Sequence, residues 1–368
     1  GNGKVYEATP SSSIRFQNNK IVGTSDNPVI FDGKELQYEN IPLSEGWNWI
    51  SFNLATQHLA HVADALENGN WVSGDVIKHD ERGFDQYSQS SGWVGTLPAL
   101  DNLSLFKLQT AQPQTLSVSG TPLDLASTPL AVAGGRWNYI SFLPLVNMTV
   151  TEALAGYQAS DQDVIKSQTG FSMYSSRNGW IGNLTYLEPG KGYMLYRKDA
   201  SQVPFPSPVL SGSLATPRLA SSSSGAGMRL NPDQIPVTSN YKFSDNMTLI
   251  ANVDPGFKLL DGDEILAYHG TELRAKALAI ADPETKGNAF FFNIAGANPG
   301  SLHFEVLRDG KSVAQTDAVI GFVANERYGT LTEPVTLHFE KSGVSTKLFP
   351  NPFQRTVSIQ AILEDGTH

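Results

Sequence analysis

The pattern of hydrophobic positions along the chain is dominated by one apolar run that occurs twice. Residues 46–52 read Gly-Trp-Asn-Trp-Ile-Ser-Phe, and residues 136–142 read Arg-Trp-Asn-Tyr-Ile-Ser-Phe. The apolar side chains of the run do not keep to one alternating face, and a glycine bounds the first copy. A short, mostly apolar run of this kind predicts a β-strand that is buried on both faces.

The two copies continue to match downstream of this strand. Asp75-Val76-Ile77-Lys78 returns unchanged at residues 163–166, and Gly92-Trp93-Val94-Gly95 returns as Gly-Trp-Ile-Gly at residues 179–182. The offset falls from 90 (136 − 46) to 88 (163 − 75) and then to 87 (179 − 92), so only short gaps separate the copies. The sequence therefore predicts a tandem duplication, with repeat module 1 at residues 37–112 and repeat module 2 at residues 113–204.

Each module is predicted to contain a strand, a short helix and then several short strands. Residues 58–66 of the first module place apolar side chains at helical spacing. In the second module, Thr149 followed three residues later by Glu152 fits a capping box, which marks the start of a helix. Two such modules in tandem are expected to pack side by side along an apolar seam.

The rest of the chain divides where its composition changes. Residues 1–36 carry two predicted strands, at 13–16 and 28–31, and form either a lead-in to the first module or the tail of a preceding domain. Residues 205–236 are rich in Ser, Pro, Gly and Ala, which predicts a flexible linker. Residues 343–368 begin a further β-rich segment.

Residues 237–342 carry short strand patterns at regular spacing, with turn signals such as Asp261-Gly262 and Asp309-Gly310 between them. Regular short strands of this kind indicate an all-β sandwich. The strands are expected at residues 247–253, 265–268, 289–294, 302–307, 318–323 and 335–339. The predicted fold class is therefore mainly β: two tandem homologous β-rich repeat modules, each with a short helix, followed by an immunoglobulin-like β-sandwich.

Composition and charge narrow the classes of function. The net charge of the 368 residues is −10, which argues against a nucleic-acid partner and against an anionic membrane surface. The chain has no cysteine, so disulfides, thiol catalysis and cysteine-bound zinc are excluded. The chain contains no run of 18 apolar residues, so no transmembrane segment is predicted. The chain does not begin with Met, and we expect it to be a fragment of a longer protein.

One short motif near the end of the chain carries a family resemblance. Leu348-Phe349-Pro350-Asn351-Pro352-Phe353 resembles the opening of the C-terminal sorting domain of the type IX secretion system of Bacteroidetes. About 22 residues are covered, and the later strands of that domain are missing, so the sorting domain is truncated. The resemblance implies a protein that is secreted or attached to the outer-membrane surface.

Two upstream regions resemble modules that accompany such sorting domains. Residues 241–337 resemble a β-sandwich module that is common just before them, although the cysteine usual in that family near Leu273-Arg274 is absent here. The Gly-Trp-Asn repeats resemble a duplicated module of bacterial surface proteins. These resemblances imply an exported protein and no reaction, because such modules are usually accessories to another domain.

Candidate metal and catalytic residues are few, and a structural interpretation is favoured for each. His58 and His61 are three residues apart but lack evident further ligands. The acidic groups Asp161/Asp163 and Asp261/Asp263/Glu264 could offer oxygens to calcium but do not follow the spacing of an EF-hand loop. No nucleophile, zinc-protease or phosphate-loop motif is present, so we predict no catalytic residue, metal or cofactor.

Aromatic residues are the better candidates for binding. Aromatic rings stack on sugars and anchor protein partners, but repeated tryptophans and tyrosines can equally be core residues of each module. We weigh both interpretations for five residues outside the most apolar strands: Trp71, Tyr87, Trp93, Tyr174 and Trp180. For Trp47, Trp49, Trp137 and Tyr139 a core position is favoured more strongly.

The expected function is that of a non-catalytic module of a secreted or cell-surface bacterial protein, adhesin-like or a scaffold. The alternative is a carbohydrate-binding accessory module of a glycan-degrading enzyme. The corresponding partners are a host or matrix protein, or a glycan. Ligand identity and oligomeric state do not follow from the sequence.

Overall fold

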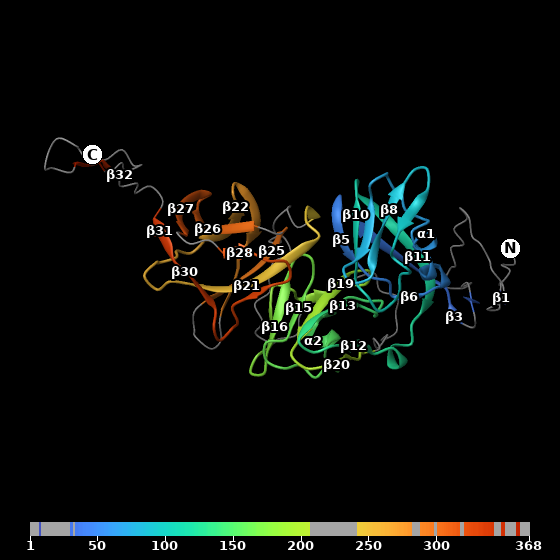
Figure 1. Cartoon of the computed structure of the whole chain (residues 1–368). Coiled ribbons are helices and arrows are strands. Elements are labelled where there is room, and N and C mark those ends of the chain that lie inside the picture. Colours follow the sequence, from blue (N-terminus) through green and yellow to red (C-terminus); the bar gives the residue numbers. More distant parts are fainter. Residues whose placement is uncertain are drawn as a thin grey trace. The chain divides into compact units, whose positions relative to one another are not determined.

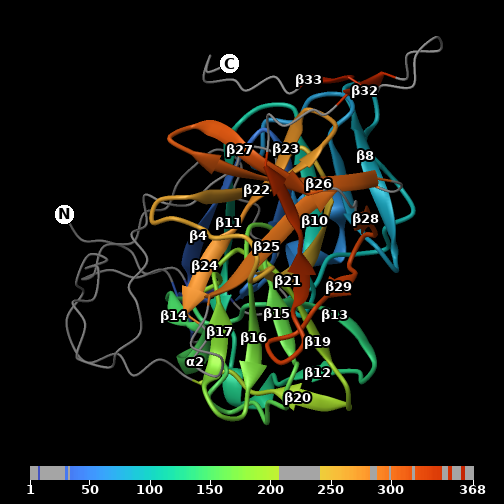
Figure 2. The same cartoon turned by 90° about the vertical axis from the view of Figure 1, so that its left-hand side faces the viewer.

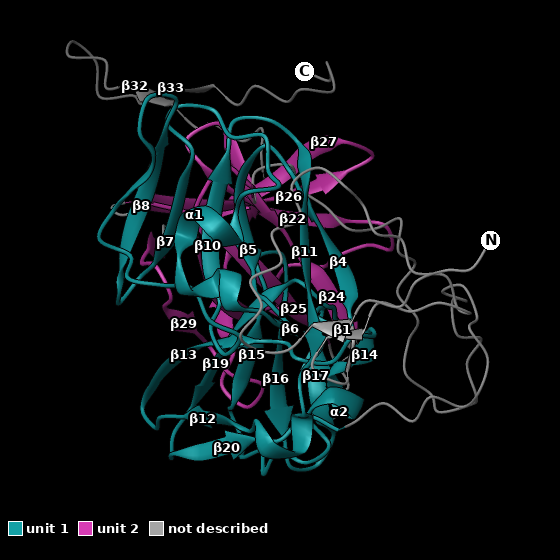
Figure 3. Ribbon diagram, turned by 90° about the vertical axis from the view of Figure 1, so that its right-hand side faces the viewer, with its two compact units in different colours: residues 1–235 teal, residues 236–368 magenta. Residues whose placement is uncertain are grey.

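The computed structural model describes residues 36–206, 241–281, 288–297, 300–316 and 320–341, together with the backbone of five short strands nearer the two ends. The chain divides into two compact units, residues 1–235 and residues 236–368 (Figures 1 and 3). Strands make up 52% of the structure and helices 6%, so the prediction of a mainly β fold is confirmed. Almost all strand pairs are antiparallel, as expected when short turns connect neighbouring strands.

Two five-stranded antiparallel sheets form the centre of the first unit. The first sheet has the order β5-β10-β7-β8-β9, and the second sheet has the order β13-β19-β15-β16-β17. The registers also correspond: Ile50 pairs with Phe106 in the first sheet, and Ile140 pairs with Tyr193 in the second. The strands are β5 (Gly46–Ile50), β7 (Val76–His79), β8 (Gly83–Ser88), β9 (Gly92–Gly95), β10 (Phe106–Thr110), β13 (Arg136–Ser141), β15 (Val164–Lys166), β16 (Phe171–Ser175), β17 (Gly179–Gly182) and β19 (Gly192–Arg197).

Short ribbons and single helical turns complete the first unit. The ribbons pair β4 with β11, β11 with β6, β12 with β20 and β14 with β18. Each sheet has its own apolar core, one around Ile50, Phe52 and Phe106 and the other around Ile140, Phe142 and Tyr193. The additional elements are β4 (Gln37–Leu43), β6 (Leu54–Ala55), η1 (Gln57–Ala60), α1 (Val62–Ala65), β11 (Gln114–Pro122), η2 (Leu125–Ser127), β12 (Leu130–Val132), β14 (Met148–Thr149), α2 (Val150–Ala153), β18 (Tyr186–Leu187) and β20 (Ser201–Val203).

The asparagine of the recurring run fixes the start of its strand. The Asn48 side chain accepts a hydrogen bond from the Ser44 amide (2.9 Å) and donates to the carbonyls of Ser44 (2.8 Å) and Gly46 (3.0 Å). Asn138 does the same with Ala133 and Arg136. A buried amide with this many backbone partners is costly to replace, which accounts for its recurrence. Beside Asn48, Trp49 and Ile50 are also buried, so the predicted burial on both faces is confirmed for this part of β5.

The second recurring segment, Asp-Val-Ile-Lys, serves three structural tasks. Its aspartate closes the preceding loop: Asp75 accepts a hydrogen bond from the Val72 amide, and Asp163 accepts one from the Ser160 amide, both at 2.9 Å. Its isoleucine, at position 77 or 165, is fully buried in the core of its sheet. Its lysine lies over a tryptophan ring of the neighbouring run, as described below.

The Gly-Trp-x-Gly segment recurs because of backbone geometry. The first glycine has a positive φ in both copies, 71° at Gly92 and 75° at Gly179, which only glycine adopts easily. The last glycine allows close strand contact: a Cβ at Gly95 or Gly182 would lie 2.1 Å from a backbone carbonyl oxygen of the adjacent strand. The capping box predicted in the second module is also confirmed, with Thr149 and Glu152 satisfying each other's backbone amides.

The second unit contains two sheets that enclose one apolar core, which includes Phe292, Phe304 and Ile294 (Figure 2). One sheet has the order β24-β25-β21-β29 with β30 beside β21, and the other has β23-β22-β26-β27-β31 with β28 beside β26. The strands are β21 (Asp245–Val253), β22 (Glu264–His269), β23 (Glu272–Lys276), β24 (Leu278–Ala281), β25 (Asn288–Gly296), β26 (Gly300–Arg308), β27 (Lys311–Thr316), β28 (Ile320–Phe322), β29 (Arg327–Tyr328), β30 (Val335–Leu337) and β31 (Phe339–Lys341). The sequence patterns predict β21, β22, β25, β26 and the regions of β28 and β30, but not β23, β24, β27, β29 or most of β31.

Several sequence predictions lie outside the described residues. These include the strand at 13–16, most of the linker at 205–236 and the Pro-Asn-Pro motif at 350–352. Near the ends of the chain, the backbone pairs β1 (Glu7–Ala8) with β2 (Ile30–Phe31), β2 with β3 (Lys34–Glu35), and β32 (Lys347–Phe349) with β33 (Ser358–Gln360).

Candidate functional site

Three of the candidate binding aromatics gather at one edge of the first sheet. The Trp93 ring lies 5.2 Å from the Trp71 ring and 5.5 Å from the Tyr87 ring, edge-on in both cases. Trp71 also donates its indole N–H to the Leu66 carbonyl at 2.6 Å. All three rings are half-buried, and the two tryptophans pack against the core of the first sheet.

The other two candidates form a separate cluster in the second sheet. Trp180 lies edge-on to Tyr174 at 5.4 Å and stacks on the buried ring of Tyr157 at 6.4 Å. Tyr174 and Trp180 are half-buried, and Trp180 packs against the core of the second sheet. The structure therefore does not bring the five candidates together. They form two separate clusters, one at each of the corresponding edges of the two sheets.

The two sheets meet along a contact that we call the seam. Its buried apolar residues are Trp49, Leu105 and Met194, with Trp137 and Tyr139 packed against them. The Lys166 ammonium lies 4.5 Å from the Trp137 ring centroid and 5.7 Å from that of Trp49. Both Lys166 and the nearby Lys107 are fully buried. The expectation of an apolar seam is therefore wrong in one respect, because the aromatic rings enclose two cations.

Lys107 also lies close to the Trp49 ring. Its ammonium lies 5.3 Å from the Trp49 centroid and 5.7 Å from the Tyr139 centroid, and it forms an ion pair with Asp80. Lys78 lies over Trp47 at 5.1 Å, as Lys166 lies over Trp137. The recurring lysine therefore has the same partner type in both sheets.

Backbone hydrogen bonds cross the seam in reciprocal positions. The Ser51 amide donates to the Gly190 carbonyl, and the Ser141 amide donates to the Leu103 carbonyl, both at 3.0 Å. The Gln168 side chain adds a double link, accepting from the Trp49 amide (3.0 Å) and donating to the Trp47 carbonyl (2.7 Å). The seam also brings β5 beside β19 through a bridge between Ile50 and Lys191 (Figure 1).

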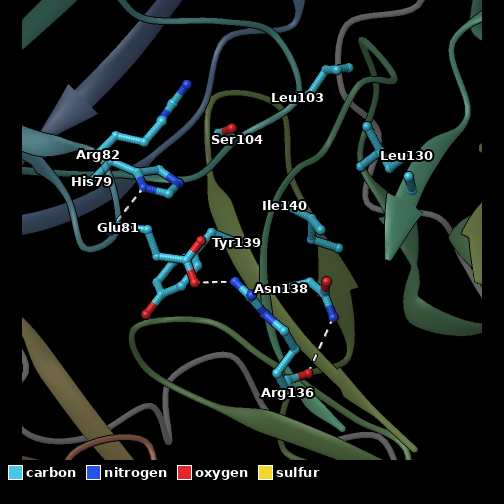
Figure 4. A pocket seen from close by; sticks show the side chains of 11 residues that line it. His79, Glu81, Arg82, Leu103, Ser104, Leu130, Arg136, Asn138, Tyr139 and Ile140 are labelled. Carbon is cyan, nitrogen blue, oxygen red and sulfur yellow. Dashed lines mark hydrogen bonds and ion pairs between the residues drawn. The ribbon is translucent and has the colours of Figure 1, made fainter. Parts of the chain in front are cut away.

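A cleft of about 330 Å³ opens beside the seam (Figure 4). Residues of the predicted first module line one part of the cleft, and residues of the predicted second module line the other. The lining residues are His79, Glu81, Arg82, Leu103, Ser104, Leu130, Ala131, Arg136, Asn138, Tyr139 and Ile140. His79 and Glu81 lie on one side of the view, with Leu103 and Leu130 on the other.

The ionisable groups of the cleft are paired or neutral. Arg136 forms an ion pair with Glu81 across the cleft, and Arg82 forms one with Asp101 at 2.6 Å. Burial lowers the pKa of His79 below its ordinary value of 6.5, and the Arg82 charge acts in the same direction. His79 is therefore uncharged at neutral pH, with its ring 5.2 Å from that of Tyr139.

Glu39 on β4 is a buried acid at the other end of the seam. Its two carboxylate oxygens are buried, and neither has a hydrogen bond of ordinary geometry within the described part of the chain. A Cβ added to Gly190 would lie 3.0 Å from one of them, so the carboxyl group packs against this turn of the second module. Burial raises the pKa of Glu39 from 4.5 to about 7, although the nearby Asn53 amides act in the opposite direction.

Most of the acidic residues considered as calcium ligands already have protein partners. Asp263 receives two hydrogen bonds from Arg308, both at 2.8 Å, and Asp163 receives one from the Tyr157 hydroxyl at 2.9 Å. Asp161 holds the Ser176 amide and hydroxyl. His58 lies 3.3 Å from a Glu67 oxygen at the surface. Within the described residues, no group of three or more His, Asp or Glu side chains is arranged to hold a metal ion.

Comparisons of the chain with models of protein families, with curated proteins and with solved structures find no match. Among the described residues, no helix is both long and apolar enough to cross a lipid bilayer.

Sequence reasoning missed the cleft and Glu39. The signal for the cleft was present where the two copies differ: Gly46 is replaced by Arg136, and His79-Asp80-Glu81 is replaced by Ser-Gln-Thr at 167–169. Of these differing residues, His79, Glu81 and Arg136 line the cleft, whereas Asp80 and Gln168 make contacts at the seam. Nothing in the pattern around Glu39 indicates that its carboxyl group is buried.

We expect Glu39→Gln to remove one part of the pH dependence of stability. The folded state retains the Glu39 proton up to about pH 7, whereas the unfolded state loses it near 4.5. The raised pKa of Glu39 therefore stabilises the folded state fully below pH 4.5. This stabilisation is lost as the pH rises through 7, by up to about 3 kcal/mol.

Urea unfolding of wild type and variant at several pH values between 4 and 8 measures this effect. The stability of the Gln variant relative to wild type should rise across this range, while the exposed control Glu45→Gln should show no such trend. If the difference in unfolding free energy between wild type and Glu39→Gln stays constant with pH, the raised pKa of Glu39 is contradicted.

Proposed function

We propose that this chain is a non-catalytic, structural part of an exported bacterial surface protein, adhesin-like or a scaffold. In this proposal two β-rich modules, related by tandem duplication, precede an immunoglobulin-like β-sandwich. The observation that carries the proposal is that the recurring asparagine, aspartate and lysine residues serve the fold. Asn48 and Asn138 clamp strands, Asp75 and Asp163 close loops, and the recurring lysines lie over tryptophan rings.

The arrangement of the strands supports the duplication. Both sheets use the same strand order, and both place a half-buried tryptophan of the Gly-Trp-x-Gly segment against the core. The pair of facing sheets around one core in the second unit supports the sandwich assignment.

Export is supported by the motif at residues 348–353, which resembles the start of a type IX sorting domain. Antibody labelling of intact cells that produce the natural protein tests this part of the proposal. We expect labelling without permeabilisation, since an exported surface protein is accessible from outside. Labelling that requires permeabilised cells would overturn the proposed location.

The role of Trp93 and Trp180 separates the structural proposal from the carbohydrate-binding alternative. That alternative is favoured by one observation, the partial exposure of both rings. If they serve the fold, Trp93→Ala and Trp180→Ala should each lower the free energy of unfolding by about 2–3 kcal/mol, somewhat less than for a fully buried tryptophan. The control Phe84→Ala removes a ring that is 52% exposed on the first sheet and should cost less than about 0.5 kcal/mol.

Denaturant unfolding of the full chain gives these differences, and binding to a panel of immobilised glycans is measured in parallel. If Trp93→Ala and Trp180→Ala unfold like wild type but no longer bind glycans, the carbohydrate-binding alternative replaces the structural proposal.

A further inference from the structure

The cleft beside the seam has a fixed shape. Its wall residues are tied together by the Ser141–Leu103 backbone hydrogen bond, by the Arg136–Glu81 ion pair and by the contact between the His79 and Tyr139 rings. The Asn138 side chain, although it lines the cleft, is fully engaged with backbone groups of its own strand region. A ligand would therefore meet a site that is already formed.

The two walls of the cleft differ in chemistry. Leu103, which is 46% exposed, lies with Leu130 and Ile140 on an apolar side. The opposite side offers a carboxylate from Glu81 and a guanidinium from Arg136. Near the top of the view, Ser104 adds a hydroxyl that donates to Asp101 at 3.2 Å and can still accept a hydrogen bond. These groups supply hydrogen-bond acceptors and donors within one small space. A ligand that fits must have an apolar face and several hydroxyl or amide groups.

The charge balance of the cleft selects against ions. Arg136 is paired with Glu81, Arg82 is paired with Asp101, and His79 is neutral. Because each of these charges already has an opposite charge beside it, a charged ligand would find no net electrostatic attraction in the cleft. A neutral ligand can use the free lone pairs and N–H groups of the pairs without separating them.

We propose that this cleft binds one neutral sugar residue, such as the terminal hexose of a glycan. A pyranose ring has an apolar C–H face for the leucine side and ring hydroxyls for Glu81, Arg136 and Ser104. The volume of about 330 Å³ lies at the lower end for small-molecule sites, which suits one sugar ring rather than a long chain. This site is distinct from the aromatic clusters at Trp93 and Trp180, and it does not depend on the structural role proposed above.

The test uses the full chain, a panel of neutral and acidic oligosaccharides, and the variant Ala131→Trp. Ala131 is exposed on β12 and lines the cleft, so an indole there fills the space without removing a hydrogen bond. We expect wild type to bind neutral glycans and Ala131→Trp to bind them at least tenfold more weakly, with an unchanged melting temperature. The control Ala60→Trp, at an exposed position in η1, should bind like wild type.

A second variant keeps the proposal testable if Ala131→Trp is poorly folded. Leu103→Ser removes the apolar wall at an exposed side chain, and we expect it to weaken binding several-fold. Three results would overturn the proposal: no binding to any neutral glycan, binding of acidic glycans alone, or neutral-glycan binding that survives both cleft variants. Loss of binding in Trp93→Ala or Trp180→Ala, with both cleft variants unaffected, would move the sugar site to the aromatic clusters.

Discussion

The first unit depends on one interaction, the contact of the Trp49 ring with two buried lysine ammonium groups. Removing an ammonium group from water costs several kcal/mol unless other groups compensate for the lost hydration. Lys166 is enclosed by Trp49 and Trp137, and Lys107 by Trp49 and Tyr139 with Asp80 as its ion-pair partner. The attraction between a cation and an aromatic face is stronger when less water surrounds the cation. The two cations therefore require both sheets to be in contact.

The other features of the first unit follow from this contact. With the two sheets in contact at Trp49, the Ser51 and Ser141 amides reach their reciprocal carbonyl partners across the seam. The Pro189-Gly190-Lys191 turn then lies against β4, which shields the Glu39 carboxyl group from water. On the other side, the loop after β7 faces the beginning of β13 and leaves the cleft between them. The acid and the cleft are thus consequences of how two similar sheets meet.

Much of the local structure could be predicted from the sequence, because local patterns determine it. The strands, the Thr149–Glu152 capping box and the glycine turns follow from hydrophobic spacing and backbone preferences. The seam could not be predicted, since nothing local distinguishes the buried Lys107 from the many exposed lysines of surface strands. For the same reason the five aromatic candidates could be named from the sequence, but the two separate clusters that they form could not be predicted. Strand β27 was missed because Lys-Ser-Val-Ala-Gln-Thr gives no clear alternation, β24 because it is apolar throughout, and β29 because it has two residues. Strand β23 was missed although its sequence, Glu-Leu-Arg-Ala-Lys, does alternate between polar and apolar residues.

The central claim is that the Trp49–lysine seam joins the two sheets into one cooperative unit. Hydrogen exchange of the full chain, followed by mass spectrometry in wild type and Trp49→Ala, tests it most directly. Truncating a buried tryptophan costs about 3–5 kcal/mol, enough to speed the slowest-exchanging amides by about 100-fold or more. We expect the variant to lose protection in β5 and β10 and, to the same extent, in β13 and β19. Loss of protection confined to the first sheet, with β13 and β19 exchanging as in wild type, would contradict the account.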